Sequence, residues 1–139
     1  KMKNMKNDCE LVSRKNDIPF KWNEKFPINS ISLMRGYLFI NNEKRKDYLE
    51  KFFNAYWRDN VDLSNQEKFI NIFSTLEIDQ TIFLDGIGNE KIKEKLKELT
   101  TEAFNKEIFG APTFISNNKI FWGQDRLEYA IDEFLNKDN

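Results

Sequence analysis

The 139-residue chain has no histidine, one cysteine, five glycines and three prolines. The absence of histidine excludes serine–histidine dyads, histidine-ligated metals and imidazole acid–base chemistry. The single cysteine, Cys9, excludes a disulfide within the chain, a cysteine-based metal site and a C-x-x-C redox pair. Any catalysis must therefore proceed without imidazole, and no metal site is expected.

Long apolar runs are also missing. The longest, such as residues 81–84, fall far short of the roughly 20 residues needed to cross a bilayer, and the basic N-terminal segment lacks the apolar region of a secretory signal. With 22 basic and 23 acidic residues, the chain has no overall field to attract nucleic acid or anionic lipid. We therefore expect neither partner, and a cytoplasmic location. Because the chain does not begin with methionine, we also expect it to be a partial chain.

Composition and periodicity indicate a folded, mostly helical chain. With 40% hydrophobic, 14% aromatic and 32% charged residues, the composition is globular, and the length suits one compact unit. Apolar spacing predicts helices within residues 5–15, 30–39, 42–56, 64–73 and 89–104, and one short turn from Asp79 that ends at Gly86 or Gly88. Two β-prone runs, 113–116 and 119–122, flank an Asn-Asn pair that suits a hairpin turn. A closing helix over 127–135 follows.

Some residues have a predicted structural role. We expect Asn42 and Asp79 to cap helices, and the Ser-x-x-Glu pattern over 64–67 to form a capping box. An aromatic and apolar stripe follows three- and four-residue steps on the helix after Asn42, and we interpret it as core. Its members are Tyr48, Leu49, Phe52, Phe53 and Tyr56.

Two motifs near the C-terminus resemble those of a known family. Residues 110–114 read Gly-Ala-Pro-Thr-Phe, and residues 121–127 read Phe-Trp-Gly-Gln-Asp-Arg-Leu. The pair closely resembles segments of 2-hydroxychromene-2-carboxylate isomerases and kappa-class glutathione transferases, in the DsbA-like branch of the thioredoxin superfamily. Upstream matches are Met5-x-x-Asp8, Ile18-Pro19, Phe26-Pro27 and Met34-Arg35. The chain departs from the family at Asn4, where tyrosine is usual, and at Asp17, where glycine is usual.

The resemblance implies an α/β thioredoxin-like fold with an all-helical insertion. Residues 1–99 would be the helical insertion domain. Residues 100–139 would be the C-terminal half of the thioredoxin-like domain, with a cis-proline loop, a β-hairpin and a terminal helix. The family's first strand, first helix with its catalytic serine, and second strand are not in this sequence. We expect the catalytic residue to lie upstream of Lys1, and this chain alone to be inactive.

The function implied by the resemblance is glutathione-dependent isomerisation of a small aromatic substrate, with bound glutathione as the nucleophile, in a homodimer. A kappa-class transferase is the close alternative, and a DsbA-like thiol oxidoreductase is a more distant one that needs a C-x-x-C motif upstream of this chain. A further alternative, from another class, is a non-catalytic fragment or binding module. In the relatives, glutathione lies in a cleft between the thioredoxin part and the helical insertion.

The resemblance also implies site residues. Glutathione would contact Ala111, Pro112, Gln124, Asp125 and Arg126, with a cis bond between Ala111 and Pro112. In the alternative interpretation, Asp125 only caps the last helix, Arg126 pairs with a neighbouring carboxylate, and Pro112 is purely a fold element. The candidates for the substrate side of the cleft are Trp22, Phe26 and Arg35, although core packing is the alternative for the two aromatic residues.

Overall fold

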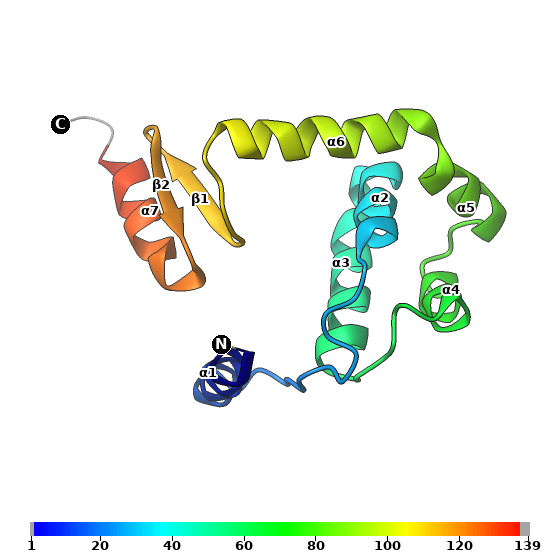
Figure 1. Cartoon of the computed structure of the whole chain (residues 1–139), viewed down its shortest axis with the longest axis horizontal. Helices are drawn as coiled ribbons and strands as arrows, with labels where there is room; N and C mark the ends of the chain where they lie inside the picture. The colour runs from blue at the N-terminus through cyan, green and yellow to red at the C-terminus, as the bar shows by residue number, and fades with distance from the viewer. Residues whose placement is uncertain (1, 137–139) are drawn as a thin grey trace. The chain divides into compact units, whose positions relative to one another are not determined.

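The computed structural model describes residues 2–136, and the chain divides into two compact units, Lys1–Leu96 and Lys97–Asn139. The first unit is helical, and the second holds the hairpin (Figure 1). In chain order, the elements are α1 (Met2–Lys15), α2 (Ile31–Phe39), α3 (Asn42–Trp57), α4 (Gln66–Ser74), α5 (Gln80–Gly88), α6 (Glu90–Asn105), β1 (Thr113–Ser116), β2 (Lys119–Trp122), the 3-10 turn η1 (Gln124–Arg126) and α7 (Leu127–Leu135). Within residues 2–136, no helix is long and apolar enough to span a membrane.

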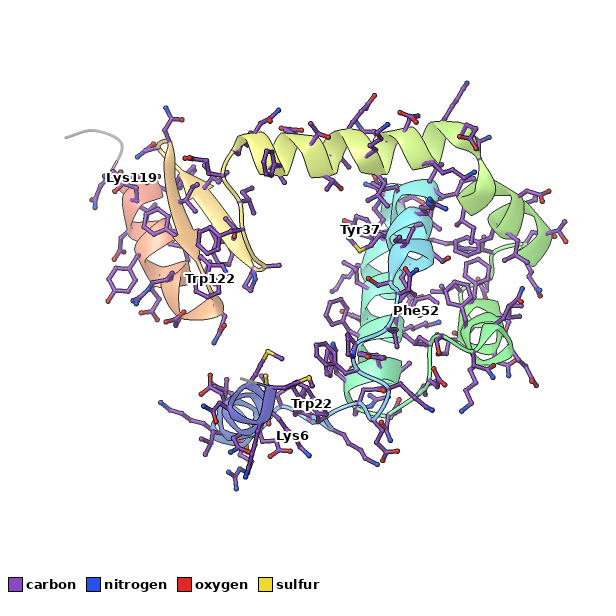
Figure 2. The ribbon with its side chains drawn as sticks, viewed as in Figure 1. Lys6, Trp22, Tyr37, Phe52, Lys119 and Trp122 are labelled. Carbon is purple, nitrogen blue, oxygen red and sulfur yellow. The ribbon has the colours of Figure 1, made fainter. Side chains whose placement is uncertain are left out.

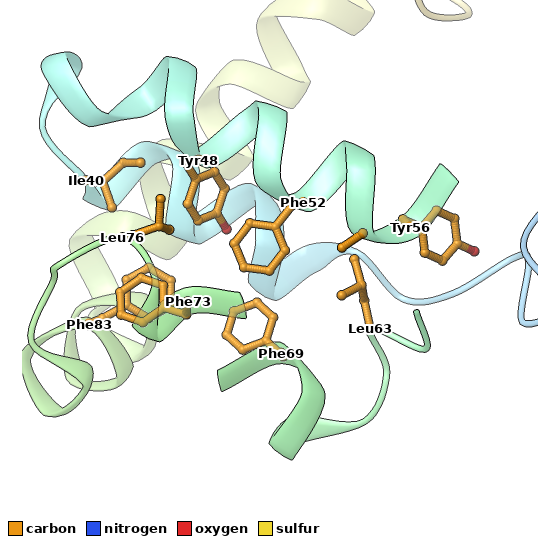
Figure 3. Packing of buried hydrophobic residues seen from close by; sticks show 10 residues of the cluster. Ile40, Tyr48, Phe52, Tyr56, Leu63, Phe69, Phe73, Leu76 and Phe83 are labelled. Atoms are coloured by element: carbon orange, nitrogen blue, oxygen red, sulfur yellow. The ribbon is translucent and has the colours of Figure 1, made fainter. Parts of the chain in front are cut away.

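The core of the first unit is built from aromatic rings (Figure 3). Phe83 of α5 is fully buried and stacks on Phe73 of α4, with ring centroids 3.8 Å apart. Tyr48, Phe52 and Tyr56 follow four-residue steps along α3, which places them on one helix face, and all three are buried. The prediction that this stripe is core is therefore confirmed for these three residues.

Two members of the stripe are not core. Leu49 and Phe53 are 40% and 59% exposed, so the core assignment was wrong for them. The physical reason is their position one residue after Tyr48 and Phe52, about 100° further round α3. Both side chains instead line a groove on the surface of this unit.

The residue that caps the N-terminus of each helix depends on which nearby side chains are free to accept hydrogen bonds from its first amides. The predicted capping box does not form, because the Ser64 hydroxyl donates to the carboxylate of Asp62 and the side chain of Asn65 caps α4. A carboxylate is a stronger acceptor than the alternatives open to this hydroxyl. Asn41, rather than Asn42, caps α3. Asp79 caps α5 as predicted, accepting from the Ile82 amide at 2.9 Å.

Two lysines of α3 donate hydrogen bonds to the backbone at the C-terminal end of α4. Lys44 Nζ donates to the carbonyl oxygens of Leu76 and Glu77, at 2.9 and 3.0 Å, and Lys51 Nζ donates to Thr75 O. These carbonyls lie just past the last helical turn, where backbone acceptors lack helical partners and the helix dipole favours cations. The two lysines therefore join α3 to α4 through charge as well as through the aromatic core.

The second unit is a hairpin covered by a helix. β1 and β2 pair antiparallel, with Thr113 opposite Trp122, and the two turn residues Asn117 and Asn118 both have positive φ, as the hairpin prediction requires. Glu133 of α7 accepts from Lys119 Nζ at 2.8 Å and from Asn117 Nδ2 at 3.3 Å. These bonds lower the pKa of Glu133 and hold α7 against the hairpin. The predicted thioredoxin-type combination of hairpin and closing helix is confirmed.

The tight packing around Gly36 predicts that Gly36→Ala destabilises the protein by about 1–3 kcal/mol through overpacking. A methyl group there would meet the Tyr48 hydroxyl and would lie 2.7 Å from the Phe83 ring. Gly88→Ala is the control, because nothing lies within 4 Å of its new methyl group, and it should be neutral or stabilising by up to about 1 kcal/mol. Urea unfolding measures both variants, and equal stability of the two would contradict the packing.

Candidate functional site

A backbone hydrogen bond closes one end of the hairpin. The Ala111–Pro112 bond is cis, as predicted, and the Gly123 amide donates to the Pro112 carbonyl at 2.9 Å. This bond lies directly beyond the strand pair of Thr113 and Trp122. It brings the segment before β1 together with the segment after β2. We call residues 110–112 and 123–126 the cis-proline corner; they include all five predicted glutathione-binding residues.

Glycine is required at the turn of this corner. Gly123 has φ 102° and ψ 151°, a region that is essentially closed to other residues. A Cβ atom there would also lie 2.5 Å from Asp125 Oδ1. The conformation of Gly123 directs the chain from β2 into η1, so that Gln124 and Asp125 follow immediately after the bond to Pro112.

Trp122 supports the corner from β2, a role that was not predicted from the sequence. Its indole lies over Gly110, where a Cβ atom would come within 2.5 Å of Nε1, and its ring centroid is 5.2 Å from that of Phe109. The Thr113 hydroxyl donates to Gly110 O. Figure 2 marks Trp122 and Lys119, the two ends of β2. The sequence could have indicated this contact, because Gly110 lies just before the first β-prone run and Trp122 ends the second, so a hairpin brings the two residues together.

Asp125 does not cap the last helix. It lies inside η1, and neither η1 nor α7 has a side-chain cap, so the capping alternative is wrong. The carboxylate is 64% exposed, with Arg126 Nε 3.9 Å away. The guanidinium of Arg126 lies over the ring of Tyr129, 5.4 Å from its centroid. Arg126 thus contacts groups of its own unit, whereas the Asp125 carboxylate faces solvent.

A groove of about 470 Å³ lies in the first unit. Its walls come from the segment before α2, from α2 and α3, and from Leu63, and Figure 2 marks Tyr37 and Phe52 among them. A volume of this size and an apolar lining are typical of sites for small molecules. The residues that line the groove are Phe26, Pro27, Ile28, Ser30, Leu33, Met34, Tyr37, Tyr48, Leu49, Phe52, Phe53, Tyr56, Trp57 and Leu63.

Two of the three predicted substrate-side residues meet at one end of this groove. Trp22, Phe26 and Trp57 contact one another, with ring centroids 5.0 to 5.8 Å apart. We call these three rings the aromatic wall; Phe26 and Trp57 line the groove directly. Arg35, the third candidate, is not among the lining residues, and its buried Nε has no hydrogen-bond partner within residues 2–136.

The groove presents no charged side chain. The Tyr48 hydroxyl donates to Leu33 O at 2.9 Å, and burial raises its pKa. The pKa of Tyr56 is also raised, first by burial and then by the carboxylate of Asp62. Both phenols therefore stay neutral at physiological pH. The arrangement suits a flat apolar molecule, because binding an ion here would leave its charge without a partner.

Comparison with known proteins agrees with the fold. Residues 1–134 match the family model of the DSBA-like thioredoxin domain, and the chain belongs to this family. A solved structure of a 2-hydroxychromene-2-carboxylate isomerase is similar, with a TM-score of 0.83 and 22% identity, over 96% of this chain and 67% of that one. The likeness confirms the thioredoxin-like fold.

The related proteins share one name. A 2-hydroxychromene-2-carboxylate isomerase of Pseudomonas sp. (strain C18) is 32% identical over 58% of this chain and 38% of its own length. The isomerase of Sphingobium xenophagum is 20% identical over 97% of this chain and 68% of its own length. The isomerase of Pseudomonas putida is 26% identical over 71% of this chain and 49% of its own length. The chain thus spans 38 to 68% of these relatives' lengths. The predicted resemblance to this family is confirmed.

The conformation of the corner predicts that Gly123→Ala lowers the free energy of unfolding by about 1–3 kcal/mol, because alanine is strained at this φ. Gln124→Ala, at the next residue, is the control. The Gln124 side chain is exposed, so this substitution should change the free energy of unfolding by less than about 0.5 kcal/mol. Thermal unfolding measures both variants. A Gly123→Ala protein as stable as the control would show that the corner does not need its glycine.

Proposed function

We propose that this chain acts in a glutathione-dependent isomerisation of the 2-hydroxychromene-2-carboxylate isomerase type. The observation that carries the proposal is the cis-proline corner, where the Gly123–Pro112 hydrogen bond gathers Ala111, Gln124 and Asp125. The shared name of the relatives supports the reaction type.

The residues of the corner fit a γ-glutamyl peptide. Ala111 is exposed two residues before β1, where its backbone is open to pair with the peptide backbone of a ligand, as in strand addition. The exposed Asp125 carboxylate is suited to accept charge-assisted hydrogen bonds from an α-ammonium group. Gln124 opens η1, where amide groups face a ligand carboxylate. Pro112 shapes the turn, and Arg126 holds the Asp125 side of the corner.

In this proposal, the groove of the helical unit receives the aromatic ring system of the substrate, and the substrate's carboxylate stays outside the apolar lining, because no charged side chain lines the groove. Its apolar lining and its volume match a bicyclic aromatic molecule. Phe26 and Trp57 offer ring surface for stacking, and Trp22 contacts both of these rings. Bound glutathione would supply the thiol nucleophile. The helical unit would bind the substrate and the hairpin unit would bind glutathione, a contribution that depends on preorganised geometry within each unit rather than on acid–base groups.

The corner predicts that Asp125→Ala weakens glutathione binding. Loss of a charge-assisted hydrogen bond costs about 1.5–3 kcal/mol, or on the order of a tenfold to hundredfold increase in Kd. Asp132→Ala is the matched control, because it removes the same charge from an exposed position on α7. Titration calorimetry with glutathione measures both variants. An unchanged Kd for Asp125→Ala, together with a lower melting temperature, would contradict the proposed ligand contact.

A further inference from the structure

Asn23 is the most deeply buried polar side chain among residues 2–136, with 1% of its surface exposed. Its Nδ2 donates to the carbonyl oxygens of Tyr56 and Val61, at 2.9 and 3.0 Å, and its Oδ1 accepts from the Lys25 amide at 2.8 Å. All three partners are main-chain groups. The side chain therefore uses both of its N–H donors and an acceptor site, as a buried amide must in order to offset the loss of water.

These bonds join two segments that are distant in the sequence. Tyr56 lies in the last turn of α3, where carbonyl groups have no partner within the helix. Two further bonds join the same segments: the Lys21 amide donates to Trp57 O at 2.6 Å, and the Glu24 amide donates to Asn60 Oδ1 at 3.0 Å. Of the three residues that donate these bonds, Lys21 and Glu24 are exposed and Asn23 is buried, so water cannot replace the bonds of Asn23.

The aromatic wall depends on this attachment. Trp22 precedes Asn23 directly, and the Phe26 amide donates to Asn23 O at 3.1 Å. Trp57 adjoins Tyr56, whose carbonyl Asn23 holds. The Asn23 side chain bonds the backbone of Lys25 and of Tyr56. Trp22 adjoins Asn23, Phe26 adjoins Lys25 and Trp57 adjoins Tyr56, so each ring lies one residue from a point of attachment. The ring distances of 5.0 to 5.8 Å follow from this fixed backbone.

We propose that Asn23 is the positioning residue of the groove: it holds Trp22, Phe26 and Trp57 in the arrangement that receives a flat aromatic ligand. The identity of that ligand as the substrate rests on the proposed function. Preorganisation of this kind raises affinity, because the rings need not be ordered when the ligand binds. An apolar residue of similar size would leave two carbonyls and an amide buried without partners.

The test compares two variants of Asn23 with a control. Asn23→Asp keeps the shape and the acceptor for Lys25 but removes both donors, and Asn23→Ala removes all three bonds. Asn60→Gly is the control, because it deletes the solvent-exposed bond to Glu24 and keeps the positive φ of 57°. Near-ultraviolet circular dichroism reports the coupling between Trp22 and Trp57. Fluorescence titration with 1-naphthol reports binding in the groove, and far-ultraviolet circular dichroism reports the helices.

We expect both Asn23 variants to lose the near-ultraviolet signal and to bind 1-naphthol at least tenfold more weakly, with the helical signal and the glutathione Kd unchanged. The control should behave like the wild type. Lowering the pH to protonate the carboxyl introduced by Asn23→Asp restores one donor, so the near-ultraviolet signal should partly recover. The unchanged helical signal distinguishes a change in ring position from a general loss of stability, and the recovery keeps the test decisive if Asn23→Ala does not fold.

The failures of the two proposals are distinguishable. If the wild type binds 1-naphthol and Asn23→Asp binds it equally well with an unchanged near-ultraviolet signal, the role of Asn23 is refuted and the proposed function is untouched. If the wild type does not bind 1-naphthol at all, the groove is not an aromatic site. That result overturns the substrate part of the proposed function and, with it, a ligand-positioning role for Asn23.

Discussion

The burial of one ring, Phe83, is the constraint on which the helical unit depends. From α5 it contacts rings of three other helices: Phe39 of α2, Tyr48 of α3, and Phe69 and Phe73 of α4, with centroids 3.8 to 6.5 Å apart. A fully buried phenylalanine removes a large apolar surface from water, and here that surface is shared by four helices. The groove is lined mainly by α2 and α3, so its shape is a consequence of their common packing against this ring.

Hydrogen bonds to the main chain at two places hold the residues of the two candidate sites in position. In the first unit, the buried amide of Asn23 fixes the loop that carries Trp22 and Phe26 to the end of α3. In the second unit, the Gly123 amide fixes the turn after β2 to Pro112. In both cases, a hydrogen bond to main chain holds the residues that would meet a ligand. The side chains themselves carry few polar contacts, which leaves ring faces in one unit and the Asp125 carboxylate in the other open to binding.

Most elements could be predicted from the sequence, because their signals are local. The helices follow the apolar period of 3.6 residues, and the Asn-Asn pair at 117–118 specifies the hairpin turn. The helix starts were predicted less well, since Asp62 competes for the Ser64 hydroxyl that the capping-box pattern assigns to α4. The role of Asn23 could not be predicted, because its partners lie 33 and 38 residues away and the surrounding segment has no period. The groove likewise depends on which helices meet.

The central claim is that the cis-proline corner binds glutathione. A titration of the 15N-labelled protein with glutathione, followed by two-dimensional amide NMR spectra, tests it most directly. The account predicts saturable shifts of the backbone amide signals of Ala111, Gln124 and Asp125 at the same ligand concentrations, with little change in α1. Amide signals at the corner that stay unchanged at millimolar glutathione, or shifts confined to other parts of the chain, would contradict the claim.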